Sequence, residues 1–242
     1  MRIAIIAAME REVGPLIRGW KAKTIEYEGR RYRLFEYGET VLTCAGIGAG
    51  TARRATEALI RYASPHRVIS AGFAGALEGS LGIGDIIEPR MVINAQDGVR
   101  TDTGGGKGIL VSSAAVAGTK QKAQLGKSYG AIAVDMEAAS VAQAAQARGI
   151  AFAALKAISD AADFELPDLD RFVANDGNFR SAAFGCHVVL RPWLWKRTIA
   201  LARNSRRASK ALAEALALYL ERASNHRDEL NVEEPQPIAH SG

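Results

Sequence analysis

The sequence predicts an α/β fold, in which a mostly parallel sheet carries helices on both of its sides. Short apolar runs typical of buried strands alternate with helix-spaced amphipathic runs along most of the 242 residues. Glycine is frequent (24 residues) and proline is not (7), which suits tight strand-to-helix turns. Carboxylates and glycines also gather where predicted strands end, and parallel sheets place their sites there.

The chain is expected to form a single domain over residues 1–224. A hydrophobic content of 48% is enough for a sizeable core, and the sequence shows neither an internal repeat nor a domain linker. The last residues are polar and contain proline, so a flexible tail is predicted for residues 225–242.

The first half of the chain supplies three predicted strands before the first long helix. Residues 2–8 (RIAIIAA) read as a strand buried on both faces, and a helix with Val13, Leu16 and Ile17 at helical spacing follows. Residues 31–46 then form a strand pair around Gly38. A glycine-rich turn leads into an amphipathic helix over residues 46–63 (GIGAGTARRATEALIRYA).

The second half continues the alternation. A strand over residues 67–72 is expected to end in a second glycine turn (GFAGALEG), an extended strand over residues 84–94 follows, and residues 97–108 read as a flexible loop. The remaining predicted elements are a strand at 109–112, a helix at about 118–127, a strand at 131–134, a helix at 137–148, a strand at 151–159 and helices thereafter.

Cysteine usage, apolar run lengths and the absence of certain motifs argue against a secreted, a membrane-spanning and a metal-binding protein. The net charge is +5, yet seven basic residues and no acidic one fall between Arg191 and Lys210. Cys44 and Cys186 are expected to be reduced thiols of a cytoplasmic protein, with no signal peptide and no apolar run of the ~18–20 residues that span a membrane. The sequence has no phosphate-binding P-loop, no convincing dinucleotide motif and no nucleophile elbow. It also lacks zinc-ligand spacing, so no metal is predicted.

The segment VDMEAAS places Asp135, Met136 and Glu137 after a strand and before a helix. Taken alone, Glu137 is more typical of a favourable partner for the helix dipole. Its two carboxylate oxygens also match two neighbouring hydroxyls, such as a ribose diol, and Met136 could pack on a sugar or base. Asp135 is expected to cap the helix or to support the site from behind.

Two more strand ends carry carboxylates. Asp160, after Ser159, reads either as a helix cap or as an acid that desolvation keeps protonated, able to protonate N7 of a leaving purine. Glu12, three residues after Met9, reads either as a surface charge or as a base for an attacking water. The glycine turns around Ile47 and Phe73 are weak signals by themselves.

In their order along the chain, the segments IAIIAAMEREV, AGIGAGTA, SAGFAGAL, AIAVDMEAASVA and FAALKAISDAAD resemble the nucleoside phosphorylase superfamily, in particular its methylthioadenosine/S-adenosylhomocysteine nucleosidases. This resemblance implies a three-layer α/β/α sandwich with a mixed, mostly parallel sheet, a homodimer, a purine nucleoside substrate and no cofactor. It assigns Glu12 to the attacking water, Glu137 and Met136 to the ribose, and Asp160 to the base. Met9, Ile47, Phe73 and Ser159 are the further expected substrate contacts.

Water is favoured over phosphate as the nucleophile. The sequence has no Gly-Asp-Pro-x-Arg segment near its start and no arginine in the second glycine turn, and Glu12 would repel an anion. Phosphorolysis stays open as the alternative, with Arg53, Arg54 and Arg90 as potential phosphate ligands. The implied reaction is hydrolysis of the N-glycosidic bond of a 5′-modified adenosine through an oxocarbenium-like state, with release of adenine.

Three departures from those nucleosidases concern the 5′ substituent. Phe73 stands where a serine is usual, the segment between GDII and VDME is shorter, and the carboxyl-terminal part resembles hopanoid-associated phosphorylase-like proteins. That subfamily implies adenosylhopane as the substrate. Residues Trp193–Arg207 then read as a peripheral membrane or lipid contact, or else as a packed helix with a solvated basic face. Nucleic-acid binding is not expected, and a non-catalytic nucleoside-binding protein is the remaining alternative.

Overall fold

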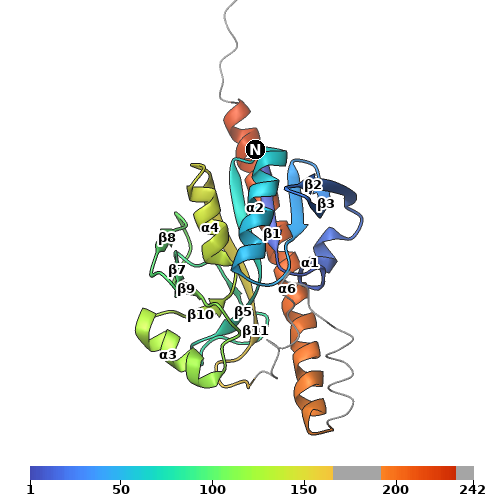
Figure 1. Ribbon diagram of the computed structural model, residues 1–242. Helices are drawn as coiled ribbons and strands as arrows, with labels where there is room; N and C mark the ends of the chain where they lie inside the picture. The colour runs from blue at the N-terminus through green and yellow to red at the C-terminus, as the bar shows by residue number, and fades with distance from the viewer. Residues whose placement is uncertain (166–191, 233–242) are drawn as a thin grey trace, which may run out of the picture.

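The computed structural model describes residues 1–165 and 192–232, which form a mixed sheet flanked by helices (Figure 1). Parallel pairing joins β4, β1, β5 and β11, and also β10, β9 and β7, while antiparallel pairing attaches the remaining strands and joins β5 to β10. The strands are β1 (Ile3–Ala7), β2 (Lys21–Tyr27), β3 (Arg30–Tyr37), β4 (Thr40–Cys44), β5 (Arg67–Ala76), β6 (Ile86–Ile87), β7 (Met91–Asn94), β8 (Arg100–Asp102), β9 (Ile109–Ser112), β10 (Ala133–Asp135) and β11 (Ala151–Asp160).

The sheet has a hydrophobic core on each face, which is why its central strands are apolar without interruption. In β1, Ile3 and Ile5 pack into one core, whereas Ala4 and Ile6 pack into the other. Successive side chains of a strand point to opposite faces, so a strand covered on both sides must be apolar at every position.

Helices complete the two outer layers. On one face lie α2 (Ala49–Ala63) and α4 (Ala138–Gln146), and on the other lie α1 (Glu10–Ile17) and the long α6 (Pro192–Val232) (Figure 1). Leu125 of α3 (Thr119–Tyr129) packs with residues of β9 and β10 in a third, smaller core. The expected three-layer α/β/α sandwich is therefore confirmed.

Most of the predicted elements are present, with four differences. Strand β2 was not predicted. The expected strand over residues 84–94 is split into β6 and β7, and the expected loop over residues 97–108 contains β8. Residues 72–75, expected to form a turn, instead extend β5, because β11 on one side and β10 on the other supply backbone partners there.

The carboxyl-terminal expectations fall partly outside the described residues. Helix α6 continues through residues 225–232, where a tail was expected, and residues 233–242 and Cys186 lie outside the described part of the chain. The side chains of residues 192–197, including Trp193 and Trp195, are also outside it. Among the described helices, none is long and apolar enough to cross a bilayer.

Candidate functional site

A cavity opens at the carboxyl ends of β1, β5, β10 and β11, where the chain turns toward its helices. The segment that follows β9 closes another side with Ala115, Val116 and Ala117. All eight residues predicted for the site line this cavity: Met9, Glu12, Ile47, Phe73, Met136, Glu137, Ser159 and Asp160. The fold thus gathers into one place residues that are up to 151 positions apart in sequence, as Met9 and Asp160 show.

Glu12 is held at the cavity by the first turn of α1. Its backbone N–H bonds to the carbonyl of Met9 at 3.0 Å, and its carboxylate accepts the backbone N–H of Ala8 at 3.3 Å. Gly72 on β5 makes room for this carboxylate, since a Cβ atom at Gly72 would lie 2.9 Å from Oε2 of Glu12. Glu12 is only 3% exposed, so it is not a surface charge of the helix.

Glu137 stands at the N-cap position of α4 but makes no side-chain capping bond. Its carboxylate instead accepts the backbone N–H of Gly48 at 2.8 Å, across 89 positions of sequence. Gly48 has a φ of 102°, a conformation that glycine adopts without strain. The carboxylate is therefore directed to the cavity, beside Met136, rather than to its own helix terminus.

Asp135, rather than Glu137, caps the N-terminus of α4 with its side chain. Its carboxylate accepts the backbone N–H of Ala138 at 2.9 Å and the hydroxyl of Ser112 at 2.6 Å. It also forms a buried ion pair with Lys156 of β11, with 2.8 Å between Nζ and Oδ2. The capping role expected for Asp135 is confirmed, and the lysine at its side is an addition that the sequence reading did not foresee.

Burial and mutual repulsion raise the pKa values of two carboxyl groups in the site. Burial, reinforced by the negative charge of Glu137, raises the pKa of Glu12 to about 7, against the opposing effect of the Lys156 ammonium. Burial first, and then the charge of Asp135, raises the pKa of Glu137 to about 7. Burial disfavours the charged form of Lys156, but the surrounding carboxylates, Asp135 foremost, outweigh it and raise the pKa of Lys156. Glu12 and Glu137 therefore change protonation near neutrality, where a general base is most effective.

Asp160 is the last residue of β11 and is 5% exposed. Its Oδ1 accepts the hydroxyl of Ser159 at 2.7 Å, and its Oδ2 accepts the ammonium of the buried Lys122. The same ammonium donates to the carbonyl of Ala161 at 2.7 Å. Gly75 makes room for this ion pair, since a Cβ atom there would lie 2.8 Å from Oδ2 of Asp160 and 3.1 Å from Cε of Lys122.

Sequence reasoning missed three charged residues of the site: Lys122, Lys156 and Arg11, the last of which also lines the cavity. For the two lysines a signal exists. Lys122 precedes Leu125 by three positions, and these two are the buried residues of α3. Lys156 interrupts the otherwise apolar run of β11, and a charge inside a strand buried on both faces needs a partner.

The arginines considered as phosphate ligands do not line this cavity. Arg53 pairs with Glu57 at 3.2 Å, and Arg90 pairs with Asp102 at 3.5 Å on the rim of β7 and β8. Arg54 lines a separate hollow between β3, β4 and α2. The cavity therefore combines four carboxylates, one buried lysine (Lys122) and apolar surface from Ile47, Phe73 and Met136, which suits a polar ligand with flat or apolar parts.

Comparison with known proteins places this arrangement in a family. The family model described as the phosphorylase superfamily matches residues 2–117 and 107–189. A 5′-methylthioadenosine/S-adenosylhomocysteine nucleosidase of Staphylococcus saprophyticus is 31% identical in an alignment of 205 residues that covers 66% of this chain and 87% of that protein. The nucleosidase of the same name from Glaesserella parasuis is 30% identical, over 68% of this chain and 88% of its own length.

Solved structures agree with the fold. Futalosine hydrolase of Helicobacter pylori has a TM-score of 0.69 at 18% identity and covers 92% of this chain and 98% of its own. An S-adenosylhomocysteine nucleosidase of Streptococcus pyogenes, in complex with 5-methylthiotubericidin, has a TM-score of 0.68 at 22% identity and covers 92% and 97%. On the family match and on the identity to these nucleosidases, the chain belongs to the nucleoside phosphorylase superfamily and is an enzyme that acts on N-ribosyl bonds.

Proposed function

We propose that this enzyme is a purine nucleosidase, which hydrolyses the N-glycosidic bond of a 5′-modified adenosine and releases adenine. The observation that carries the proposal is the convergence of Glu12, Glu137 and Asp160 on one cavity from three separate parts of the chain. A site that only binds a nucleoside would need hydroxyl and base contacts, but not a buried base and a separate proton donor as well.

Glu12, Glu137 and Asp160 each have a separate role in a cleavage that passes through an oxocarbenium-like state. Glu137 accepts two ribose hydroxyls and so orients the sugar, while Met136 packs against it. Asp160 delivers a proton to the purine, which is a poor leaving group as an anion. Glu12 takes a proton from the water that attacks the anomeric carbon, and a pKa of about 7 suits that task.

Water is the better nucleophile for this site than phosphate. The carboxylate of Glu12 lies buried where the nucleophile would have to enter, so a phosphate dianion would meet a like charge. Arg53 and Arg90 are engaged by Glu57 and Asp102 away from the cavity. Phosphorolysis remains the alternative reaction, and the products distinguish the two.

For the 5′ substituent we propose a large apolar group, with adenosylhopane as the specific substrate. The proposal rests on the sequence resemblance of the carboxyl-terminal part and on the exposed face of α6. Ile199 of that helix is 68% exposed and lies in a stretch with the exposed Arg203 and Arg206, as a lipid contact requires. Methylthioadenosine and S-adenosylhomocysteine, named for the relatives above, are the alternative substrates.

The decisive experiment measures adenine release from adenosylhopane, methylthioadenosine and S-adenosylhomocysteine, each with and without phosphate. Free ribose products at phosphate-independent rates are expected, whereas a ribose 1-phosphate product would establish phosphorolysis instead. A bulky 5′ group that blocks turnover while methylthioadenosine is cleaved well would end the adenosylhopane proposal.

Variants test the roles within that assay. Glu12→Gln and Asp160→Asn should each lower kcat by about 100-fold or more, because each removes a proton-transfer group. Glu10→Gln is the matched control, since Glu10 lies on the same helix but pairs with Arg33 at the surface. If both site variants release adenine at the wild-type rate, the chain is not a nucleosidase of the proposed kind.

Two further expectations concern the protein in the cell. We propose a homodimer in the cytoplasm with peripheral lipid contact through residues Trp193–Arg207. Sedimentation velocity tests the dimer, and co-sedimentation with anionic vesicles tests the lipid contact. A monomer across the accessible concentration range, or protein that stays in the supernatant, would refute the respective expectation.

A further inference from the structure

The ion pair between Lys122 and Asp160 is the feature of the site that the three-carboxylate scheme leaves unused. Lys122 comes from α3 and Asp160 from the end of β11, 38 positions apart in sequence. Both side chains are almost fully buried, with 2% of the lysine side chain and 7% of the aspartate side chain exposed. Both residues also line the cavity, so the pair faces the place where a substrate would bind.

We propose that Lys122 is the proton reservoir for the leaving base and acts through Asp160. This inference rests on the proposed nucleosidase function. In the resting site both oxygens of Asp160 accept hydrogen bonds, one from Ser159 and one from the ammonium of Lys122. The second of these bonds places an Nζ–H of Lys122 directly against Oδ2 of Asp160, so the lysine supplies a transferable proton next to the carboxylate.

The geometry around the ammonium supports a fixed donor rather than a loose counter-ion. The carbonyl of Ala161 accepts a second hydrogen bond from the same nitrogen at 2.7 Å, which fixes its position against Asp160. Gly75 lies against both partners and leaves no room for a side chain beside the pair.

The proton balance of the step is complete. As the C1′–N9 bond breaks, its electron pair leaves with the purine, Nζ of Lys122 passes a proton to Oδ2 of Asp160, and Asp160 passes a proton on to N7. Asp160 is therefore a carboxylate again at the end of the step, and Lys122 is neutral. The attacking water forms the new C1′–O bond and gives its proton to Glu12. Exchange with solvent after product release restores both Lys122 and Glu12.

The test uses the full-length protein, with 5′-methylthioadenosine and adenosylhopane as probes. Lys122→Arg keeps a positive charge that does not deprotonate, and Lys122→Gln keeps a hydrogen bond without the charge. Both should lower kcat by about 100-fold or more with little change in KM, because proton delivery matters in the transition state rather than in binding. Thermal unfolding shows whether each variant is folded, and Lys122→Gln serves if the larger arginine does not fit.

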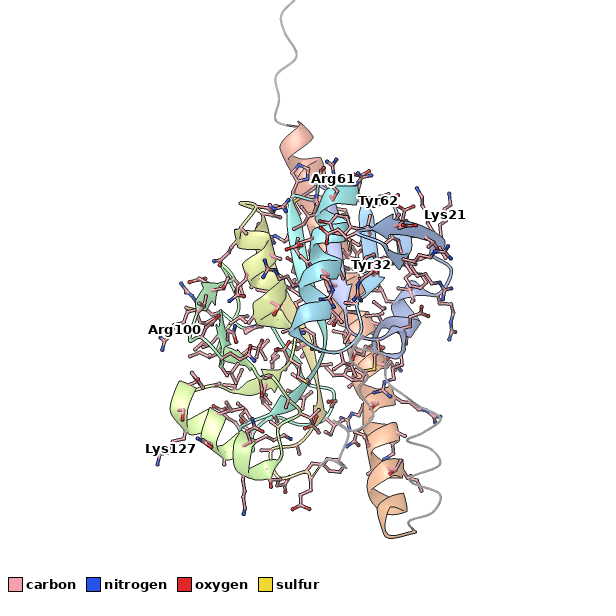
Figure 2. All side chains as sticks on the ribbon, viewed as in Figure 1. Lys21, Tyr32, Arg61, Tyr62, Arg100 and Lys127 are labelled. Atoms are coloured by element: carbon pink, nitrogen blue, oxygen red, sulfur yellow. The ribbon has the colours of Figure 1, made fainter. Side chains whose placement is uncertain are left out.

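Matched controls lie on the same helix. Lys120 and Lys127 are exposed, and Figure 2 shows Lys127 on the outer side of α3, pointing away from the fold. Lys120→Gln and Lys127→Gln should therefore leave kcat unchanged. A loss of activity in these controls as large as in Lys122→Gln would show that the effect comes from the helix and not from the ion pair, and would overturn the proposal.

Two readouts separate a proton reservoir from a structural role. In the double variant Lys122→Gln/Asp160→Asn, the loss should equal that of Asp160→Asn alone, because Lys122 acts only through Asp160. A p-nitrophenyl riboside has a leaving group that is stable as an anion, so its cleavage should survive in Lys122→Gln. Losses that multiply in the double variant, or equal losses for both leaving groups, would overturn the proposal. Wild-type protein that releases adenine from neither probe would instead refute the nucleosidase function itself.

Discussion

Substitution of Lys156 tests most directly how the site keeps several carboxylates buried. This lysine is 1% exposed, pairs with Asp135 at 2.8 Å and also acts on the pKa values of Glu12 and Glu137. Lys156→Met preserves the length and the apolar stem of the side chain but removes the charge. The variant leaves Asp135 buried without its cation, and leaves the two neighbouring carboxylates without the charge that lowers their pKa.

The size of the effect follows from the contact. Coulomb's law gives about 6 kcal/mol for two unit charges at the Nζ–Oδ2 separation, with an effective dielectric constant of about 20. Desolvation of both groups offsets much of this attraction, yet removal of one partner from a buried pair costs about 3–5 kcal/mol, because the other charge stays behind. We therefore expect Lys156→Met to lower the free energy of unfolding by about 3–5 kcal/mol at neutral pH.

The assay is urea unfolding of the wild type, Lys156→Met, Asp135→Asn and the double variant. The double variant should recover part of the loss, since neither charge is then left alone. The loss in Lys156→Met should be smaller at about pH 5 than at about pH 8, because Glu12 and Glu137, whose pKa values are raised to about 7, are protonated at the lower pH and no longer need the cation. A loss below about 1 kcal/mol at neutral pH, or one that is independent of pH, would refute the reasoning.

Two further predictions concern the wild-type pH dependence and the glycines of β5. Because the pKa values of Glu12 and Glu137 are raised to about 7, kcat/KM should increase as the pH rises through about 7, and a profile that is flat there would contradict the assignment. Glu12 and Glu137 bind protons more tightly in the folded state than in the unfolded state, where their pKa has its ordinary value of 4.5. Their contribution to stability should therefore be present below pH 4.5 and be lost as the pH rises through about 7, and urea unfolding at a series of pH values measures this loss. Gly75→Ala should displace Asp160 and lower kcat by about 10–100-fold, whereas Gly79→Ala, with no atom within 4 Å of its added Cβ, should not change kcat; equal activity of the two variants would show that the close approach at Gly75 is not needed.

The sheet and the carboxylates were predictable because their signals are local. Apolar runs on both faces of β1 predict a covered strand, and acidic residues directly after such runs predict a polar strand end. The rule that sites form at the carboxyl ends of parallel strands then brings Glu12, Glu137 and Asp160 together without knowledge of the full topology. The order of the strands in space was not needed for this step.

The lysines were not predictable by the same rules, because their partners are set by tertiary contacts. In helix α3 the three-residue spacing between Lys122 and Leu125 places Lys122 on the buried face, but it does not show which group Lys122 meets there. The pairing of Lys122 with Asp160 depends on where α3 lies beside the end of β11, which no pattern within α3 encodes. The extension of β5 past residue 72 was missed for a similar reason, since neighbouring strands override the usual preference of glycine for turns.

Strand β5 has a consequence for how such a site could diverge. Gly72 lies against Glu12, the base of the proposed reaction, and Gly75, three residues later, lies against Asp160, its proposed acid. In the proposed reaction, a substitution at Gly72 would therefore alter activation of the nucleophile, and one at Gly75 would alter departure of the base. Evolution or an engineer could therefore change one half of the reaction while the other half keeps its geometry.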